Sequence, residues 1–149
     1  MLVSVPTSRS RAIGSREILR LTAMAAAMAS AAAIWVVAEL GLGMDLRAPS
    51  FDGSLQTLPI RLQDVLLVSA LLSFAAWGSV AVLERLTTRA RKVWLVIAVA
   101  ALVLSLGTPL AGTGASLTNR IVLMVMHLAV GSVLIPALYR TSPSRNQDA

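Results

Sequence analysis

The feature that most constrains the fold is the presence of four long stretches without a charged side chain, at residues 21–38, 65–83, 93–119 and 121–139. A bilayer core is ~30 Å thick, so a helix that crosses it needs roughly 20 mainly apolar residues at about 1.5 Å each. All four stretches meet that length. The third ends in a segment rich in Gly, Thr and Pro, so we expect its helix to stop near residue 110 and a short loop to follow.

The composition also points to a membrane as the surrounding solvent. Hydrophobic residues make up 56% of the chain and charged residues 13%, whereas a soluble domain is about 45–50% apolar and about a quarter charged. The stretches lack the alternation of membrane strands, and only helices satisfy their backbone groups within one segment. The sequence therefore predicts an all-α, four-helix transmembrane bundle with up-down topology and helices at about 21–41, 64–84, 93–110 and 120–139.

The length fits a single domain. We expect a membrane domain at 18–140, flanked by a flexible basic segment at 1–17 and a flexible tail at 141–149, because both flanks have little apolar content. The alternative that the first stretch is a cleaved signal peptide is less favoured. Its apolar part is longer than the usual length of about 7–15 residues.

The distribution of basic residues predicts the orientation. If the helices alternate in direction, most of the 13 Lys and Arg residues fall on one side, and only Arg47, Arg61 and Arg120 fall on the other. Basic residues concentrate on the cytoplasmic side of membrane proteins. We therefore expect a multi-pass protein of the cell (inner or plasma) membrane with both termini in the cytoplasm. The same pattern explains the net charge of +6 without a nucleic-acid partner.

Ionisable residues at membrane depth are costly and are candidates for function. The topology places several of them in the outer half of the bundle, and the candidate polar intramembrane site consists of Glu39, Asp64, Arg120 and His127. Histidine can exchange a proton near neutral pH. One hypothesis makes His127 a proton relay with Glu39 or Asp64 as its partner, and the other makes it a neutral residue hydrogen-bonded across the bundle. Glu39 is expected to be solvated or paired with Arg61 or Arg120.

Small and polar residues recur every three or four positions on three of the expected helices, and such stripes usually face neighbouring helices. We expect them to be packing seams. The stripes are Ala25, Ala29 and Ala33; Ser69, Ser73, Ala76 and Val80; and Arg120, Met124, His127 and Gly131.

Two of the connections carry separate predictions. The outer loop at 43–61 is nearly neutral, and we expect it to cap the bundle. The inner loop is strongly basic: it either enforces topology only or binds anionic lipid, each basic side chain contributing ~1 kcal/mol. Glu84 is expected to pair with a neighbouring arginine and Trp94 to anchor the interface. The candidate lipid contacts are Arg85, Arg89, Arg91 and Lys92.

No motif in the sequence predicts catalysis. Cysteine is absent, and one histidine with two distant carboxylates falls short of the three or four ligands of a metal site. We expect no enzyme activity, no metal and no cofactor. The favoured function is a structural, accessory or regulatory one, exerted through helix–helix or lipid contacts with the bilayer and with another membrane protein or a second copy. The alternative is a small proton-coupled carrier that uses Glu39, Asp64 and His127.

Three segments carry a resemblance to a known family: ERLTTRARKVW at 84–94, SLGTPLAG at 105–112 and MHLAVGSVLIPAL at 126–138. Together with LGMDLR at 42–47, they resemble an uncharacterised family of four-helix integral membrane proteins of actinobacteria, defined as a domain of unknown function. The resemblance implies the fold and the compartment but no activity. The segment AIWVVAELG is faintly similar to the first helix of small multidrug-resistance transporters. Their glutamate lies near mid-membrane, however, and Glu39 is expected at the outer end.

Overall fold

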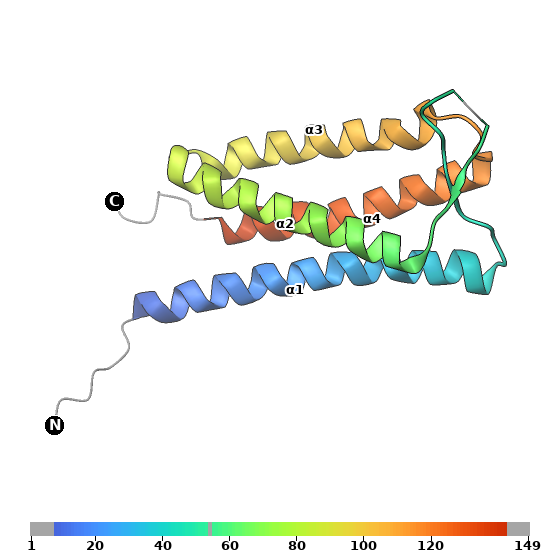
Figure 1. Cartoon of the computed structure of the whole chain (residues 1–149). Helices are drawn as coiled ribbons and strands as arrows, with labels where there is room; N and C mark the ends of the chain where they lie inside the picture. The colour runs from blue at the N-terminus through green and yellow to red at the C-terminus, as the bar shows by residue number, and fades with distance from the viewer. Residues whose placement is uncertain (1–7, 54, 143–149) are drawn as a thin grey trace.

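The computed structural model describes residues 8–53 and 55–142, and helices dominate it (Figure 1). The four helices are α1 (Ser8–Val36), α2 (Leu62–Leu86), α3 (Ala90–Ala111) and α4 (Leu117–Thr141). Each contains a segment long and apolar enough to cross a membrane, with a mean hydropathy between 1.9 and 2.4. These elements confirm the predicted fold class and indicate a membrane protein.

The helix boundaries differ from the prediction mainly at the N-terminus. Helix α1 begins at Ser8, so much of the segment predicted to be flexible at 1–17 is helical. Arginine and glutamate have good helix propensity, and they extend the helix past its apolar part. Helix α4 begins three residues early because the Ser116 hydroxyl caps it, accepting a hydrogen bond from Asn119 N at 3.2 Å. Most of the predicted flexible tail, 143–149, lies outside the described residues.

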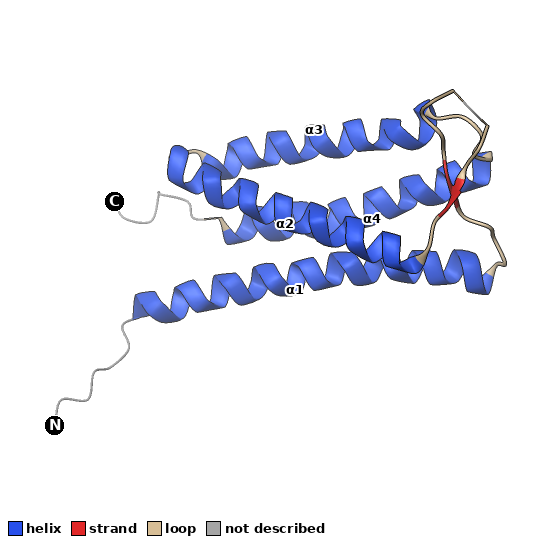
Figure 2. Ribbon diagram, in the orientation of Figure 1, coloured by secondary structure: helices blue, strands red, loops and turns tan. Residues whose placement is uncertain are grey.

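Consecutive helices run in opposite directions (Figure 1), and their contacts close a ring. Helices α1 and α3 each pack on α2 and α4, and a smaller α2–α4 contact lies on the diagonal. The start of α1, the end of α2, the start of α3 and the end of α4 therefore share one end of the bundle, which we call the basic end. The opposite end, where the loop after α1 folds over the helices, is the capped end (Figure 2).

The core consists of three clusters along the bundle axis. Trp94 and Leu138 pack near the basic end, Met24 and Leu134 pack in the middle, and the capped end holds a third cluster around Met126. Large apolar side chains cover the outward faces of all four helices. Such a surface suits hydrocarbon as the surrounding medium, because lipid tails are as apolar as these side chains.

The predicted packing seam of α2 is confirmed, and that of α1 is wrong. Ser69, Ser73 and Val80 are buried on α2, with Ala76 packed against the same cluster. On α1 the predicted residues Ala25, Ala29 and Ala33 are exposed. The buried small residues are instead Ala23, Ala27 and Ala31. A shift of two residues rotates a helix face by about 200°, so the packed face is nearly opposite to the predicted one.

The predicted stripe on α4 lies beside the deepest part of the interface. Its four members, Arg120, Met124, His127 and Gly131, are half-buried, whereas the fully packed face carries Met126, Leu134 and Leu138. Gly131 faces α3, because a Cβ atom added there would lie 2.9 Å from both Cδ atoms of Leu102. The stripe therefore borders the α3–α4 contact.

Candidate functional site

The capped end is closed by the loop after α1, which forms a short hairpin and contacts the α3–α4 connection. Strand β1 (Arg47–Ala48) pairs antiparallel with β2 (Leu58–Pro59), two strands that the all-helical prediction did not include (Figure 2). Beyond β1, the backbones of Ser50 and Thr113 exchange hydrogen bonds of 3.0 and 2.9 Å. The predicted capping role of this loop is confirmed, and we refer to residues 42–61 as the cap.

Leu46 inserts from the cap into the bundle. Its side chain is 0% exposed and packs with Ala38, in the π-helical turn Val37–Gly41 that follows α1, and with Met126 of α4. The Leu46 carbonyl accepts a hydrogen bond from Ile60 N at 2.8 Å, so both arms of the hairpin hold this position. The Leu46 side chain thus fills the space between the helices at the capped end.

Glu39 and Asp64 both hold backbone at the capped end. Glu39 lies in the π-helical turn Val37–Gly41 that ends the first helix, and its Oε1 accepts a hydrogen bond from Leu46 N at 3.1 Å. Asp64 Oδ2 accepts from Arg61 N at 2.9 Å, which fixes the start of α2. Glu39 was expected to be solvated or paired with Arg61 or Arg120; among the described residues no such ion pair is found, and its side chain is half-buried.

Arg120, at the first turn of α4, binds a row of carbonyl oxygens. Its guanidinium donates to the carbonyls of Leu110 and Gly112 at 2.7 Å each, and to that of Ala115 at 3.1 Å. These carbonyls belong to the end of α3 and the following loop, where unpaired backbone oxygens concentrate partial negative charge. Arg120 therefore closes the α3–α4 connection beneath the cap.

Three further residues of the capped end were missed by the sequence reasoning. Asn119 Nδ2 donates to Asp45 O at 3.1 Å, and Trp35 Nε1 donates to Ile60 O at 2.8 Å. Gly114 has a φ of +82°, and a Cβ atom there would lie 2.7 Å from Leu55 O. The only sequence signal was the glycine in a turn-rich segment, since the distant partners of Asn119 and Trp35 depend on tertiary structure.

His127 bonds within its own helix. Its Nδ1 lies 2.7 Å from Leu123 O, and because a carbonyl oxygen can only accept, Nδ1 carries the proton in this contact. Among the described residues no hydrogen bond of His127 across the bundle is found, so that prediction is not confirmed. Glu39, Asp64 and His127 have three separate partners, and the structure does not join them in one polar site.

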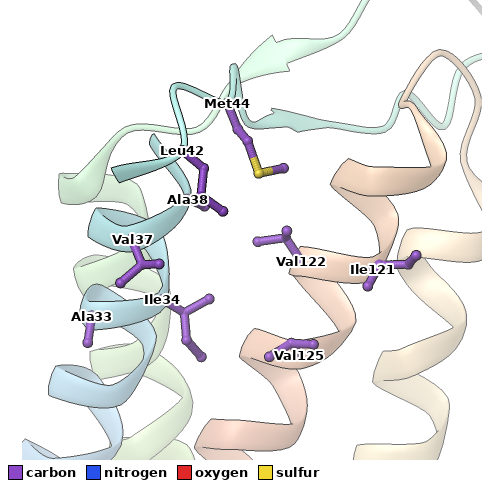
Figure 3. A pocket seen from close by; sticks show the side chains of 9 residues that line it. All are labelled: Ala33, Ile34, Val37, Ala38, Leu42, Met44, Ile121, Val122 and Val125. Atoms are coloured by element: carbon purple, nitrogen blue, oxygen red, sulfur yellow. The ribbon is translucent and has the colours of Figure 1, made fainter. Parts of the chain in front are cut away.

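An apolar groove of about 310 Å³ lies between α1 and α4 just below the cap (Figure 3). The π-helical turn forms one wall, and the first turns of α4 form the other. No polar side chain lines it. The lining residues are Ala33, Ile34, Val37, Ala38, Leu42, Met44, Ile121, Val122 and Val125.

At the basic end, a buried arginine joins three helices. Arg20 of α1 is 4% exposed, and its Nη2 lies 2.5 Å from Glu84 Oε1 of α2. It also donates to the hydroxyl and carbonyl oxygens of Thr141 at 3.2 and 3.3 Å. Glu84 therefore pairs with Arg20 of α1 and not with a neighbouring arginine of the basic loop, so the predicted partner is wrong. The role of Arg20 was missed, because its sequence position marked only the membrane boundary.

The predicted lipid contacts do not share one environment. Arg85, Arg89 and Lys92 are exposed, whereas Arg91 is half-buried with its guanidinium carbon 4.1 Å from the ring centre of Tyr139. That distance is typical of a cation–π contact. Trp94, predicted as an interface anchor, is instead buried in the core cluster of the basic end.

Comparison with known proteins gives one match. The model of a protein family described as a family of unknown function (DUF6069) matches residues 11–144, which include nearly all of the four helices. No curated protein and no solved structure matches the chain.

Proposed function

The chain belongs to the DUF6069 family, and we propose that it is a small integral membrane protein with a structural, accessory or regulatory role rather than a catalytic one. It exerts this role through helix–helix or lipid contacts. The observation that carries the proposal is the use of three charged groups at the capped end, Glu39, Asp64 and Arg120, to hold the backbone of the cap and its neighbouring turns.

The bonding of these groups supports a static role. A carrier that couples transport to protons needs an ionisable group that can exchange its partner during the cycle, and such groups usually face a cavity. Here the carboxylate of Glu39 fixes a buried loop residue, and Asp64 fixes a helix start. The same bonds argue against the carrier alternative, whose three residues have separate partners.

The shape of the capped end supports the same conclusion. Leu46 fills the space between α1 and α4, and the groove beneath the cap is lined by apolar side chains only. An apolar lining suits hydrocarbon chains and offers no hydrogen bond to a polar substrate. The outward helix faces, which are also apolar, remain the main surface for another membrane protein or a second copy.

We further propose that the protein resides in the cell membrane with both termini in the cytoplasm. Arg16, Arg20 and Arg140 lie at the same end as the basic α2–α3 turn (Figure 1). Cytoplasmic loops of membrane proteins carry such an excess of basic residues. Reporter fusions at the C-terminus test the orientation, and a reporter active only outside the cell would contradict it.

The functional class is tested with three single variants of the full chain in proteoliposomes. We expect vesicles with the wild-type protein to show no pH-dependent flux above that of empty vesicles. The variants His127→Leu and Glu39→Gln should give the same result. Met124→Leu, a volume-conserving change on the same side of α4, serves as the control. In parallel, affinity purification in mild detergent identifies proteins retained by wild type and by His127→Leu. A flux present in wild type and abolished by His127→Leu, but kept by Met124→Leu, would establish the carrier instead.

A further inference from the structure

We propose that the basic end is a binding surface for the headgroups of anionic phospholipids, with Arg85, Arg89 and Lys92 as its contact residues. This inference rests on the proposed function in two respects, namely that the bundle spans a bilayer and that its basic end faces the cytoplasm. It goes further by naming a partner and a place on the molecule.

The turn that carries the three cations is short and ordered. Helix α2 ends at Leu86 and α3 begins at Ala90. Thr87 anchors both sides, since its N–H donates to Leu83 O at 2.9 Å and its hydroxyl accepts from Arg89 N at 3.2 Å. The backbone beneath the cations is therefore fixed, and a headgroup that binds there does not have to order a loop.

The carboxylates of the basic end are held by a different residue. Buried Arg20 contacts Glu84 at 2.5 Å and Glu17 at 3.7 Å. Within residues 8–53 and 55–142, the ion pairs found do not include Arg85, Arg89 or Lys92. Arg20 thus engages both Glu17 and Glu84, and among the described residues no ion pair joins either carboxylate to the three exposed cations.

Arg91 supports this surface without belonging to it. Its guanidinium stacks on Tyr139 of α4, which fixes the first turn of α3 against the bundle. A cation in this position keeps its charge and adds to the positive potential of the turn. We therefore remove Arg91 from the predicted set of lipid contacts and assign it a positioning role.

The position of the cations selects a lipid over a soluble polyanion. Exposed apolar side chains flank them on both helices, with Leu86 of α2 77% exposed and Val96 of α3 69% exposed. These side chains belong in hydrocarbon, so the neighbouring cations lie at the level of the phosphate layer. Guanidinium groups bind phosphate oxygens in bidentate geometry, and the cytoplasmic leaflet is rich in anionic lipid.

The test measures lipid retention by the full chain in nanodiscs that contain equal amounts of phosphatidylglycerol and phosphatidylcholine. After release into detergent, native mass spectrometry counts each lipid that stays bound. We expect wild type to retain phosphatidylglycerol preferentially, and Arg85→Gln/Arg89→Gln to lower that preference on the order of tenfold. The matched control, Arg47→Gln/Arg61→Gln, removes the same two charges from the capped end and should keep the preference.

The outcomes separate this inference from the proposed function. Equal retention of the two lipids by wild type, or an equal loss in both double variants, would overturn the headgroup site while leaving the membrane role intact. Release of phosphatidylglycerol by duplex DNA at low salt would assign the surface to nucleic acid instead. Thermal unfolding of each variant in nanodiscs shows whether lost binding reflects lost structure. If the double variant is unfolded, Lys92→Gln replaces it. This single change should lower the preference for phosphatidylglycerol, by less than the loss expected of the double variant.

Discussion

Arg20 and Glu84, 64 positions apart in sequence, form an ion pair at the basic end with the arginine side chain 5% exposed and the glutamate side chain 20% exposed. Arg20→Met should destabilise the bundle by about 3 kcal/mol, because it leaves a partly buried carboxylate without its partner. The double variant Arg20→Met/Glu84→Leu should recover part of that loss. Unfolding in bilayers or mild detergent measures both.

A control for this pair is available on the same helix. Glu17 approaches Arg20 only to 3.7 Å, and its side chain is 44% exposed. Glu17→Gln should change the free energy of unfolding by less than about 1 kcal/mol, as is typical of solvent-exposed pairs. An effect of Glu17→Gln equal to that of Arg20→Met would show that overall charge, and not the buried contact, stabilises this end.

Arg120→Gln should loosen the α3–α4 connection. The change removes charge-assisted hydrogen bonds to Leu110 O, Gly112 O and Ala115 O, each worth about 1.5–3 kcal/mol. Hydrogen exchange should speed up at residues 110–116 and in the cap, with little change at the basic end. Arg61→Gln, which removes an exposed arginine of the same end, should leave exchange at 110–116 unchanged.

Gly114→Ala should disturb the cap more than Gly53→Ala does. Both glycines have positive φ, +82° and +81°, so alanine pays a similar backbone cost of roughly 1–2 kcal/mol at either position. Only at Gly114 would the added Cβ meet backbone, 2.7 Å from Leu55 O, whereas nothing lies within 4 Å at Gly53. Comparable unfolding midpoints for the two variants would contradict the close approach of the cap to this loop.

Ala27→Leu should weaken the contact between α1 and its neighbours, because Ala27 is fully buried in the middle cluster. Overpacking of this kind costs about 1–3 kcal/mol. Ala29→Leu, two positions away on the exposed face, should be tolerated. If Ala29→Leu proved the more damaging change, α1 would pack through the face predicted from its sequence.

The sequence was sufficient to predict the number and approximate extent of the helices, because a bilayer demands one length of apolar segment. It also predicted the seam of α2, where serines stand out against large apolar residues. It failed on α1, because an alanine-rich helix offers small residues on every side and no periodicity marks the packed face. There Arg20 and Met24, buried beside Ala27, mark the face that packs.

The hydrogen-bond partners of the polar residues could not be predicted from the sequence, for a different reason. Glu39, Asn119 and Trp35 each bond to backbone of the cap, and a backbone group carries no sequence signal. Reasoning from side-chain charge therefore favoured carboxylate–arginine pairs that the structure does not form. His127 was expected to reach across the bundle, but the carbonyl one turn earlier in its own helix is always within reach.

The partners of Arg20 are synthesised at different times, because Glu84 lies in the second helix and Thr141 in the fourth. Glu84 becomes available to Arg20 as soon as the second helix enters the membrane, so the first hairpin can neutralise this charge while translation continues. Thr141 emerges only after the fourth helix has been made. The bonds from Arg20 to Thr141 therefore join the first helix to be synthesised to the last, and they can form only when all four helices are present.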